Sequence, residues 1–313
     1  MSKERELNNL FSSDDYKHVL EFYNKFKDRE ALIQWGVNRQ NSPANIHIVN
    51  GNSEIVIIIP TANYKGEYAR RCREIFKGFK IVFVDSGGIN PYFRYSRNCN
   101  IGIKAALKYQ SKWIIVANDD LKQIDDLSLL RSELQKIDNK NIKAVFSTGF
   151  SNRAYLFARR RFTKLFYIIK SRVMAKRQGL TPNEYMMIYK RYLNLCKKFK
   201  VIYFPMPHKF LNRLFFKKVQ PLLANDFFWI LSSEFCNKLK GKVFDETFLF
   251  DCEDADLSLC IKPKERTVIT FRIAPRYKFG GGTAGKTLSR EFRSLYGLIC
   301  LNKFYQQGKY TQI

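Results

Sequence analysis

The strongest constraint on the fold is a regular alternation between short apolar runs and helix-like segments over residues 54–150. Four runs are almost continuously apolar, and they span residues 54–60, 80–85, 112–119 and 142–147. Such runs are typical of parallel strands that are buried on both faces of a sheet. The segments between them have the spacing of helices, so the order predicts βαβ units in an α/β fold with a mostly parallel central sheet.

The rest of the chain follows other patterns, and the changes of pattern divide it into four parts. A single Rossmann-like domain is expected, built from two α/β halves, with a helical extension before it and a basic helical insertion within it. The predicted parts are residues 1–50 (extension), 51–150 (first half), 151–224 (insertion) and 225–313 (second half). In the second half, residues 226–232 and 266–273 are expected to be strands, and residues 288–306 a closing helix.

The insertion carries most of the positive charge of the chain. Residues 151–224 hold 18 Lys/Arg and one acid, Glu184, which is +17 of the formal net charge of +27. We predict two amphipathic helices here, the first with an apolar stripe from Phe162 to Val173 and the second starting at a capping box, Thr181 to Glu184.

Three interpretations of this charge are open. It can be a solvated face, or it can hold residues 155–220 against an anionic membrane, since basic amphipathic helices lie in the lipid interface. Nucleic-acid binding is less favoured, because no known nucleic-acid-binding module is recognisable.

Cysteine usage and hydropathy restrict the class of protein and its compartment. The seven cysteines form no CxxC pair and the chain has three histidines, which makes a zinc site improbable and fits a reducing compartment. The N-terminus has no apolar stretch like that of a signal peptide, and no run of 18 apolar residues occurs. We therefore expect a cytoplasmic protein, peripheral on a membrane if the insertion binds lipid. Richness in Asn, Lys, Ile, Phe and Tyr suggests an AT-rich genome, such as that of a virus or parasite.

Polar residues stand where three of the predicted strands end. Thr61 follows the first strand, Asp85 the second, and Asn118, Asp119 and Asp120 the third. The carboxyl ends of parallel strands share one edge of a sheet, where ligands bind. Asp85 could accept a hydrogen bond from a nucleotide base, and Asp119 and Asp120 offer the hard oxygen ligands that Mg²⁺ or Mn²⁺ prefers. The alternative is ordinary turn and helix-cap chemistry.

A second group of acids occurs late in the chain. Glu253, Asp254 and Asp256 stand close together at the predicted start of a helix. One interpretation is a helix N-terminus, where negative charge is favoured by the backbone dipoles. The other is a general base that takes the proton of an acceptor hydroxyl.

Six motifs in order give the chain a resemblance to family-2 glycosyltransferases, in particular to the rhamnosyl- and galactosyltransferase-like branch. The motifs are IVIIIPTAN, IVFVDSGG, SRNCNIGIKAAL, WIIVANDDL, FDETFLFDCEDADLSL and FGGGTAG, within residues 54–150 and 225–285. The resemblance implies the A-type nucleotide-diphospho-sugar transferase fold. It also implies a hexosyltransferase-like reaction, in which sugar passes with inversion from a nucleotide-diphosphate donor to a hydroxyl of a glycan, lipid-linked or protein acceptor, assisted by Mg²⁺ or Mn²⁺.

The same resemblance assigns roles to single residues. For the donor it implies Thr61 and Asn63 in the nucleotide pocket, Asp85 at the base, and Arg97, Asn98, Asn100 and Gly102 in a helix entry near the nucleotide. For the chemistry it implies Asp120, with Asp119, as the metal ligand and Asp254, next to Glu253, as the catalytic base.

The chain departs from the family at one place. Relatives often carry a histidine shortly before the GGT segment, and here Arg276-Tyr277-Lys278-Phe279 stands instead. Lys278 cannot bind metal while protonated, but it can contact the diphosphate directly. Two alternative functions remain open: a non-catalytic basic membrane- or nucleic-acid-binding protein on a glycosyltransferase-like scaffold, and a nucleotidyltransferase. The second would normally have a Gly-rich phosphate loop after the first strand, which residues 59–67 do not offer.

Overall fold

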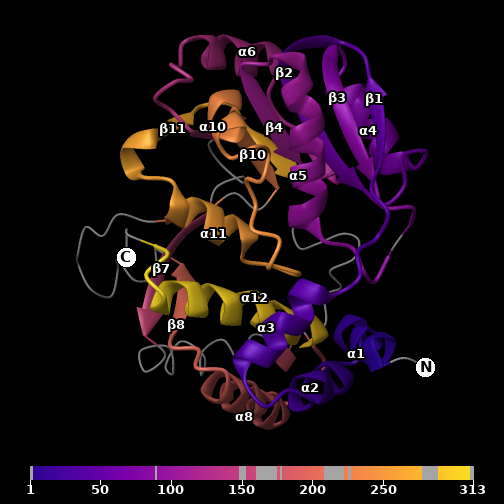
Figure 1. The fold of residues 1–313 in the computed structure, drawn as a ribbon, viewed down its shortest axis with the longest axis vertical. Coiled ribbons are helices and arrows are strands. Elements are labelled where there is room, and N and C mark those ends of the chain that lie inside the picture. Colours follow the sequence, from indigo (N-terminus) through magenta and orange to yellow (C-terminus); the bar gives the residue numbers. More distant parts are fainter. Residues whose placement is uncertain are drawn as a thin grey trace.

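The computed structural model describes residues 3–88, 90–147, 153–159, 175–176, 178–207, 222–224, 227–276 and 288–310. Figure 1 shows two stacked parts, a sheet flanked by helices in the upper part and a layer of helices in the lower part. Helix α11 (Glu253–Cys260) lies between the two parts. The mixed α/β architecture predicted from the sequence is confirmed.

Within the described ranges, seven strands form the central sheet in the order β1-β3-β2-β4-β10-β6-β11. These strands are β1 (Asn45–Val49), β2 (Asn52–Thr61), β3 (Phe79–Asp85), β4 (Trp113–Ala117), β6 (Ala144–Ser147), β10 (Phe228–Ser232) and β11 (Arg266–Ile269). β1 and β10 are antiparallel to their neighbours, while the pairs β2–β3, β2–β4 and β6–β11 are parallel. Five of these seven strands therefore run in one direction, so the sheet is mostly parallel as expected but contains two reversed strands.

Helices cover both faces of this sheet because its central strands are apolar on both sides. Along β2, Ile57 and Ile59 face the core that contains α4 (Glu67–Ile75) and α6 (Leu127–Gln135). Val56 and Ile58 face the opposite core, which contains α5 (Tyr95–Ala106), the 3₁₀ turn η1 (Leu107–Tyr109) and α10 (Ser233–Lys238). Gly102 lets α5 lie directly on β2, since a Cβ at this position would be 2.2 Å from Ile58 Cγ2.

The lower helical layer shares one apolar core. Its helices are α1 (Lys3–Ser12), α2 (Tyr16–Asn24), α3 (Arg29–Asn38), α8 (Pro182–Lys198) and α12 (Leu288–Gln306). Helix α11 contributes to both parts, because Leu257 packs in the sheet core and Ala255 and Leu259 pack in the helical core. The parts are thus joined by continuous packing, and none of the described helices is long and apolar enough to cross a bilayer.

Two departures from the sequence-based expectation concern single strands. Residues 1–50 are not wholly helical, because β1 pairs with β3 at the edge of the sheet. The expected strand at 266–273 is split into β11 and β12 (Ile273–Pro275), and β12 pairs with β5 (Leu121–Gln123). The split occurs because the backbone N–H groups of Thr270 and Phe271 donate to the Glu133 carboxylate, at 3.0 and 2.9 Å, instead of to a ladder partner.

The described part of the insertion also differs from the two amphipathic helices predicted for it. Its second helix is confirmed as α8, with the predicted capping box between Thr181 and Glu184. Three unexpected strands, β7 (Arg153–Arg159), β8 (Tyr203–Pro207) and β9 (Leu222–Ala224), form an antiparallel sheet in the described part of this region. The first predicted helix, with its stripe from Phe162 to Val173, lies outside the described residues.

Candidate functional site

The candidate site is built where the strand order reverses. From the central strand β2, the chain passes first to β3 on one side and then to β4 on the other. In open α/β sheets, ligands bind beyond the carboxyl ends of the strands at this point. β2 ends at Thr61, β3 ends at Asp85, and Asn118, Asp119 and Asp120 follow β4. The topology therefore brings the three strand ends to one edge of the sheet.

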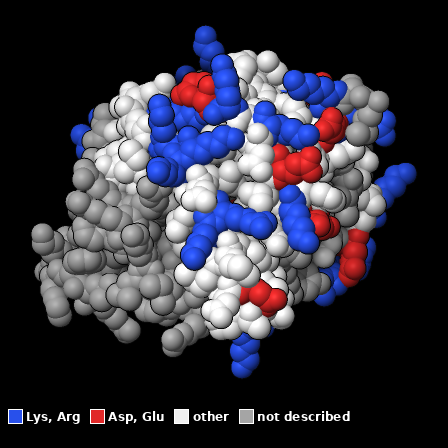
Figure 2. Space-filling model, turned by 90° about the horizontal axis from the view of Figure 1, so that it is seen from below, with Lys and Arg blue, Asp and Glu red and all other residues white. Residues whose placement is uncertain are grey.

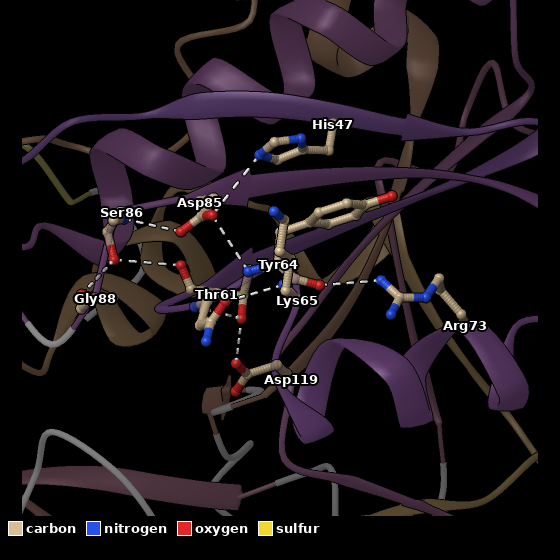
Figure 3. A network of polar contacts seen from close by, with 11 residues as sticks. His47, Thr61, Tyr64, Lys65, Arg73, Asp85, Ser86, Gly88 and Asp119 are labelled. Carbon is tan, nitrogen blue, oxygen red and sulfur yellow. Dashed lines mark hydrogen bonds and ion pairs between the residues drawn. The ribbon is translucent and has the colours of Figure 1, made fainter.

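A side-chain hydrogen bond spans the reversal point. The Thr61 hydroxyl donates to Asp119 Oδ2 at 2.7 Å, which joins the ends of β2 and β4 across 58 residues of chain (Figure 3). Thr61 is buried and Asp119 is half-buried. The Thr61 carbonyl in turn accepts hydrogen bonds from the Ser86 N–H at 3.0 Å and hydroxyl at 3.2 Å. Thr61 thus connects all three strand ends, as the order of the strands predicts.

Asp85 holds the loops on either side of it. Its Oδ2 accepts from the Tyr64 N–H at 3.2 Å and its Oδ1 from the Gly87 N–H at 2.8 Å. His47 Nε2 lies 3.7 Å from Oδ2, and the His47 ring stacks on Tyr64 with 4.1 Å between ring centroids (Figure 3). Each oxygen therefore already accepts one backbone hydrogen bond, so a ligand would have to use the second lone pairs.

Tyr64 lies between two cationic or polar side chains. On the opposite side from His47, the Arg73 guanidinium lies 5.0 Å from the Tyr64 ring centroid and donates to the Tyr64 carbonyl at 3.1 Å. His47, Tyr64 and Arg73 are not among the residues that the sequence motifs indicate. The only sequence signal for Tyr64 is its position three residues after the end of a buried strand, whereas His47 comes from the edge strand that was not predicted.

The carboxylates after β4 are held in an unfavourable environment for their charged forms. Burial raises the pKa of Asp119 from 3.8 to about 6, the Thr61 hydrogen bond opposes this increase, and the neighbouring charge of Asp120 adds to it. Burial also raises the pKa of Asp120, while hydrogen bonds from its own backbone and from Asn118 lower it. Within the described ranges, no lysine, arginine or histidine forms an ion pair with either carboxylate.

Two asparagines near this edge carry buried polar atoms without partners in the described part of the chain. They are Asn118 Oδ1 and both side-chain atoms of Asn98. Asn98 lies one helical turn before Gly102, which faces Ile58 and Val84, so both residues are on the side of α5 that covers the sheet. Buried polar atoms are costly when unpaired, which makes these atoms candidate ligand contacts.

Three other residues predicted to lie near the nucleotide form hydrogen bonds within the fold. Asn63 is exposed, and its Oδ1 accepts from the Lys65 N–H at 2.9 Å, which is a local turn contact. Arg97 donates to the Ser42 carbonyl at 3.0 Å. Asn100 lies further along α5 and fastens the segment after α10, because its Oδ1 accepts from the N–H groups of Val243 and Phe244, each at 3.0 Å.

The second acid pair lies on the first turn of α11. Asp254 Oδ1 accepts from the Ala255 N–H at 2.7 Å, as in the helix-terminus interpretation. Burial raises the pKa of the Tyr95 hydroxyl, and the charges of Cys99, Glu253 and Asp120 raise it further. The pKa of Tyr95, at the start of α5, is thus raised by charges from both acidic groups.

The turn before α11 is tightly constrained. Asp251 and Cys252 both have left-handed backbones, with φ of 57° and 73°, although neither is glycine. Gly297 of α12 allows this turn to approach, since a Cβ there would lie 2.3 Å from the Asp251 carbonyl oxygen. The Ser294 hydroxyl donates to the Asp251 carboxylate. Helix α12 thus fixes the turn that presents Glu253 and Asp254.

Other observations set limits on the site. Among the described residues, no cluster of three or more His, Cys, Asp or Glu side chains could hold a metal by itself. A hollow of about 100 Å³ between Glu54, Lys112 and Arg131 lies at the opposite edge of the sheet, where β2 and β4 begin. Lys278 and Gly280–Gly282 lie outside the described residues.

The chain matches no protein-family model, and no curated protein matches it.

Proposed function

We propose that the chain is a glycosyltransferase of the A-type nucleotide-sugar fold, which moves a sugar from a nucleotide-diphosphate donor to an acceptor hydroxyl with inversion. The hydrogen bond between Thr61 and Asp119 carries this proposal, because it spans the reversal point of the sheet where nucleotide ligands bind. The neighbouring position of Asp85 supports it, since the strand ends then offer separate groups for a base and for a diphosphate.

The residues after β4 fit a divalent cation. Asn118 Oδ1 is a buried acceptor with no partner among the described residues, and Asp119 and Asp120 beside it repel each other. These are oxygen ligands of the kind that Mg²⁺ and Mn²⁺ bind, and they would hold the cation from the protein side. When bound, such a cation neutralises the charge of the departing diphosphate. In this assignment Asp120 is the main ligand, and Thr61 orients Asp119.

The acid pair on α11 supplies the base in this proposal. Asp254 takes the proton from the acceptor hydroxyl, whose oxygen then attacks the anomeric carbon as the diphosphate leaves. The Ala255 N–H fixes the Asp254 carboxylate, and α12 fixes the turn before it. Glu253 is the alternative base, because it stands next to Asp254 on the first turn of α11.

Calorimetric titration of the chain with a panel of nucleotide-sugars, each with and without Mn²⁺, tests the proposal. We expect one nucleotide class to bind with a Mn²⁺-dependent affinity, and Asp120→Ala to lose most of it. The matched control is Asp125→Ala, which removes an acid that pairs with Arg272 and lies outside the site. Absence of binding across the panel would favour the non-catalytic alternative on the same scaffold.

A further inference from the structure

The exposed basic residues of α8 differ from those of the other helices in the lower layer. Residues 3–38 contain six Lys/Arg and seven Asp/Glu, and many of these charges are paired. Lys25 contacts Glu6 at 3.3 Å and Glu21 at 3.2 Å, and Arg29 contacts Glu30 at 2.8 Å. The positive charges of α1 to α3 are therefore largely compensated within their own surface.

On α8 and the residues that follow it, the positive charges are not compensated. Residues 182–200 contain five Lys/Arg and one acid, Glu184, whose carboxylate accepts from Thr181 in the capping box. Lys190, Arg191, Lys197 and Lys200 are exposed, and none forms an ion pair within the described ranges. We name these four residues the α8 basic face.

Figure 2 shows this end of the molecule from below. Lys and Arg side chains spread over the middle of the face, and most Asp and Glu side chains lie toward its right side. In Figure 1, α8 lies at the lower end of the molecule, away from the sheet that carries the candidate site. A planar anionic partner could therefore contact the α8 basic face without covering the carboxyl ends of the strands.

Apolar side chains accompany these charges. Met187 is 59% exposed, and it lies on the same stripe as Lys190 and Arg191 at helical spacing. Ile202, just after the helix, is 43% exposed. An aliphatic side chain among unpaired cations is the pattern of helices that lie in a lipid interface, where the cations meet headgroups and the apolar group enters the acyl boundary.

The aromatic residues of α8 argue against single-stranded nucleic acid as the partner. Such partners are bound by exposed rings on which the bases stack. On α8, Tyr185 and Tyr189 are only 2% and 7% exposed, and Tyr192 packs on Phe292 of α12 with 5.7 Å between ring centroids. The rings of this helix thus serve the core, and its exposed face offers charge and aliphatic groups.

From these observations we infer that the α8 basic face is a docking surface for an anionic phospholipid bilayer. The inference does not depend on the proposed reaction, because it rests on a different surface. Each Lys or Arg near an anionic membrane strengthens binding roughly fivefold. The attraction weakens with salt, because the screening length falls from about 10 Å at 0.1 M to about 3 Å at 1 M.

The test is flotation of the full chain with vesicles of phosphatidylcholine alone or mixed with phosphatidylserine. The variant is Lys190→Gln/Arg191→Gln/Lys197→Gln, and its matched control is Lys17→Gln/Lys25→Gln/Lys27→Gln, which removes the same charge from α2 and the residues after it. We expect binding to mixed vesicles only, a loss of about 100-fold in the α8 variant and a much smaller loss in the control. Met187→Asp should weaken binding about tenfold or more without changing the thermal melt.

Several results would overturn the inference. They are equal recovery with both vesicle types, no recovery with either, or equal losses in the α8 variant and its control. Duplex DNA and single-stranded RNA serve as competing polyanions in the same salt series. Tighter binding to either of them than to the mixed vesicles, with the same dependence on the three α8 residues, would also overturn the assignment to lipid.

Discussion

Two acidic turns stand a few residues apart in the chain and have opposite environments. In the turn after β4, burial raises the pKa of Asp119 to about 6 and also raises the pKa of Asp120. In the next turn, hydrogen bonds from Arg272 lower the pKa of Asp125, and hydrogen bonds from Ser128 lower the pKa of Asp126. Ionisation of the second pair of acids therefore stabilises the fold, whereas ionisation of the first pair costs stability.

This difference separates a structural acid from a candidate functional one. Arg272 donates to both oxygens of Asp125, at 2.8 and 3.1 Å, which ties the loop before β12 to the turn before α6. Nothing in the described part of the chain compensates Asp119 and Asp120 in that way. Perturbed carboxylates at a strand end are common at sites whose compensating charge is a ligand.

The largest expected effect follows from removing the central carboxylate of the first turn. Asp120→Ala should lower sugar transfer by about 10³-fold or more, because the charge of the leaving diphosphate is then no longer compensated through this residue. Asp125→Ala should keep transfer within a few-fold of the parent chain. The measurement is release of nucleoside diphosphate under saturating donor. Equal losses in the two variants would remove the distinction between the turns.

The acid pair of α11 provides a second comparison with a buried structural acid. Asp254→Asn should lower transfer by about 10²- to 10⁴-fold while the donor affinity stays unchanged, because a base acts on the acceptor and not on the donor. Asp256 lies two residues away, and Lys309 contacts its carboxylate at 2.8 Å. Asp256→Asn should instead lower the melting temperature, because the ammonium group of Lys309 then loses one of its two carboxylate partners. Full transfer by Asp254→Asn would move the assignment to Glu253.

The stability of the two turns should respond to pH in opposite directions. The pKa of Asp119 in the folded chain lies above its ordinary value of 3.8, so ionisation of this carboxylate lowers the free energy of unfolding. This decrease develops as pH rises from about 4 to 6. Asp119→Asn should therefore raise the free energy of unfolding by on the order of 2 kcal/mol at pH 7.5. Below pH 4 the gain should disappear.

The lowered pKa of Asp125 has the opposite sign. Its contribution to stability is present above the ordinary pKa and is lost as pH falls, so Asp125→Asn should destabilise the chain at pH 7.5. Urea unfolding of both variants at the two pH values measures this. A loss of stability in Asp119→Asn at pH 7.5 would contradict the proposed cost of that carboxylate.

The smallest expected effect concerns the link across the strand ends. Thr61→Val keeps the shape of the side chain but removes its 2.7 Å hydrogen bond to Asp119. We expect the donor affinity to fall about five- to tenfold, with little change in transfer at saturating donor. An unchanged affinity would show that Thr61 does not orient the carboxylate for the donor.

Much of the sheet could be predicted because its central strands are continuous apolar runs. The same runs also predict that Thr61, Asp85 and Asp119 lie close together, since parallel strands place their carboxyl ends at one edge of the sheet. Strand β1 was missed because it is an edge strand with Ile46 and Ile48 exposed, which leaves a weak pattern. Its antiparallel pairing with β3 is a long-range contact that local spacing does not reveal.

The details of the site were less accessible to sequence reasoning. The capacity of Asp85 to accept a hydrogen bond from a ligand depends on two loops. These loops place the N–H groups of Tyr64 and Gly87 so that they donate to its carboxylate. The break between β11 and β12 depends on Glu133, a residue more than 130 positions earlier. Such contacts are decided by tertiary packing, which a local pattern does not encode.

The most direct test of the central claim is Mn²⁺ binding measured by electron paramagnetic resonance in the presence of a nucleoside diphosphate. We expect bound Mn²⁺ in the unaltered chain and in Asp125→Ala, with binding that requires the nucleotide and is lost in Asp120→Ala. Equal Mn²⁺ binding by all three chains, or none by the parent chain with any nucleotide, would contradict it.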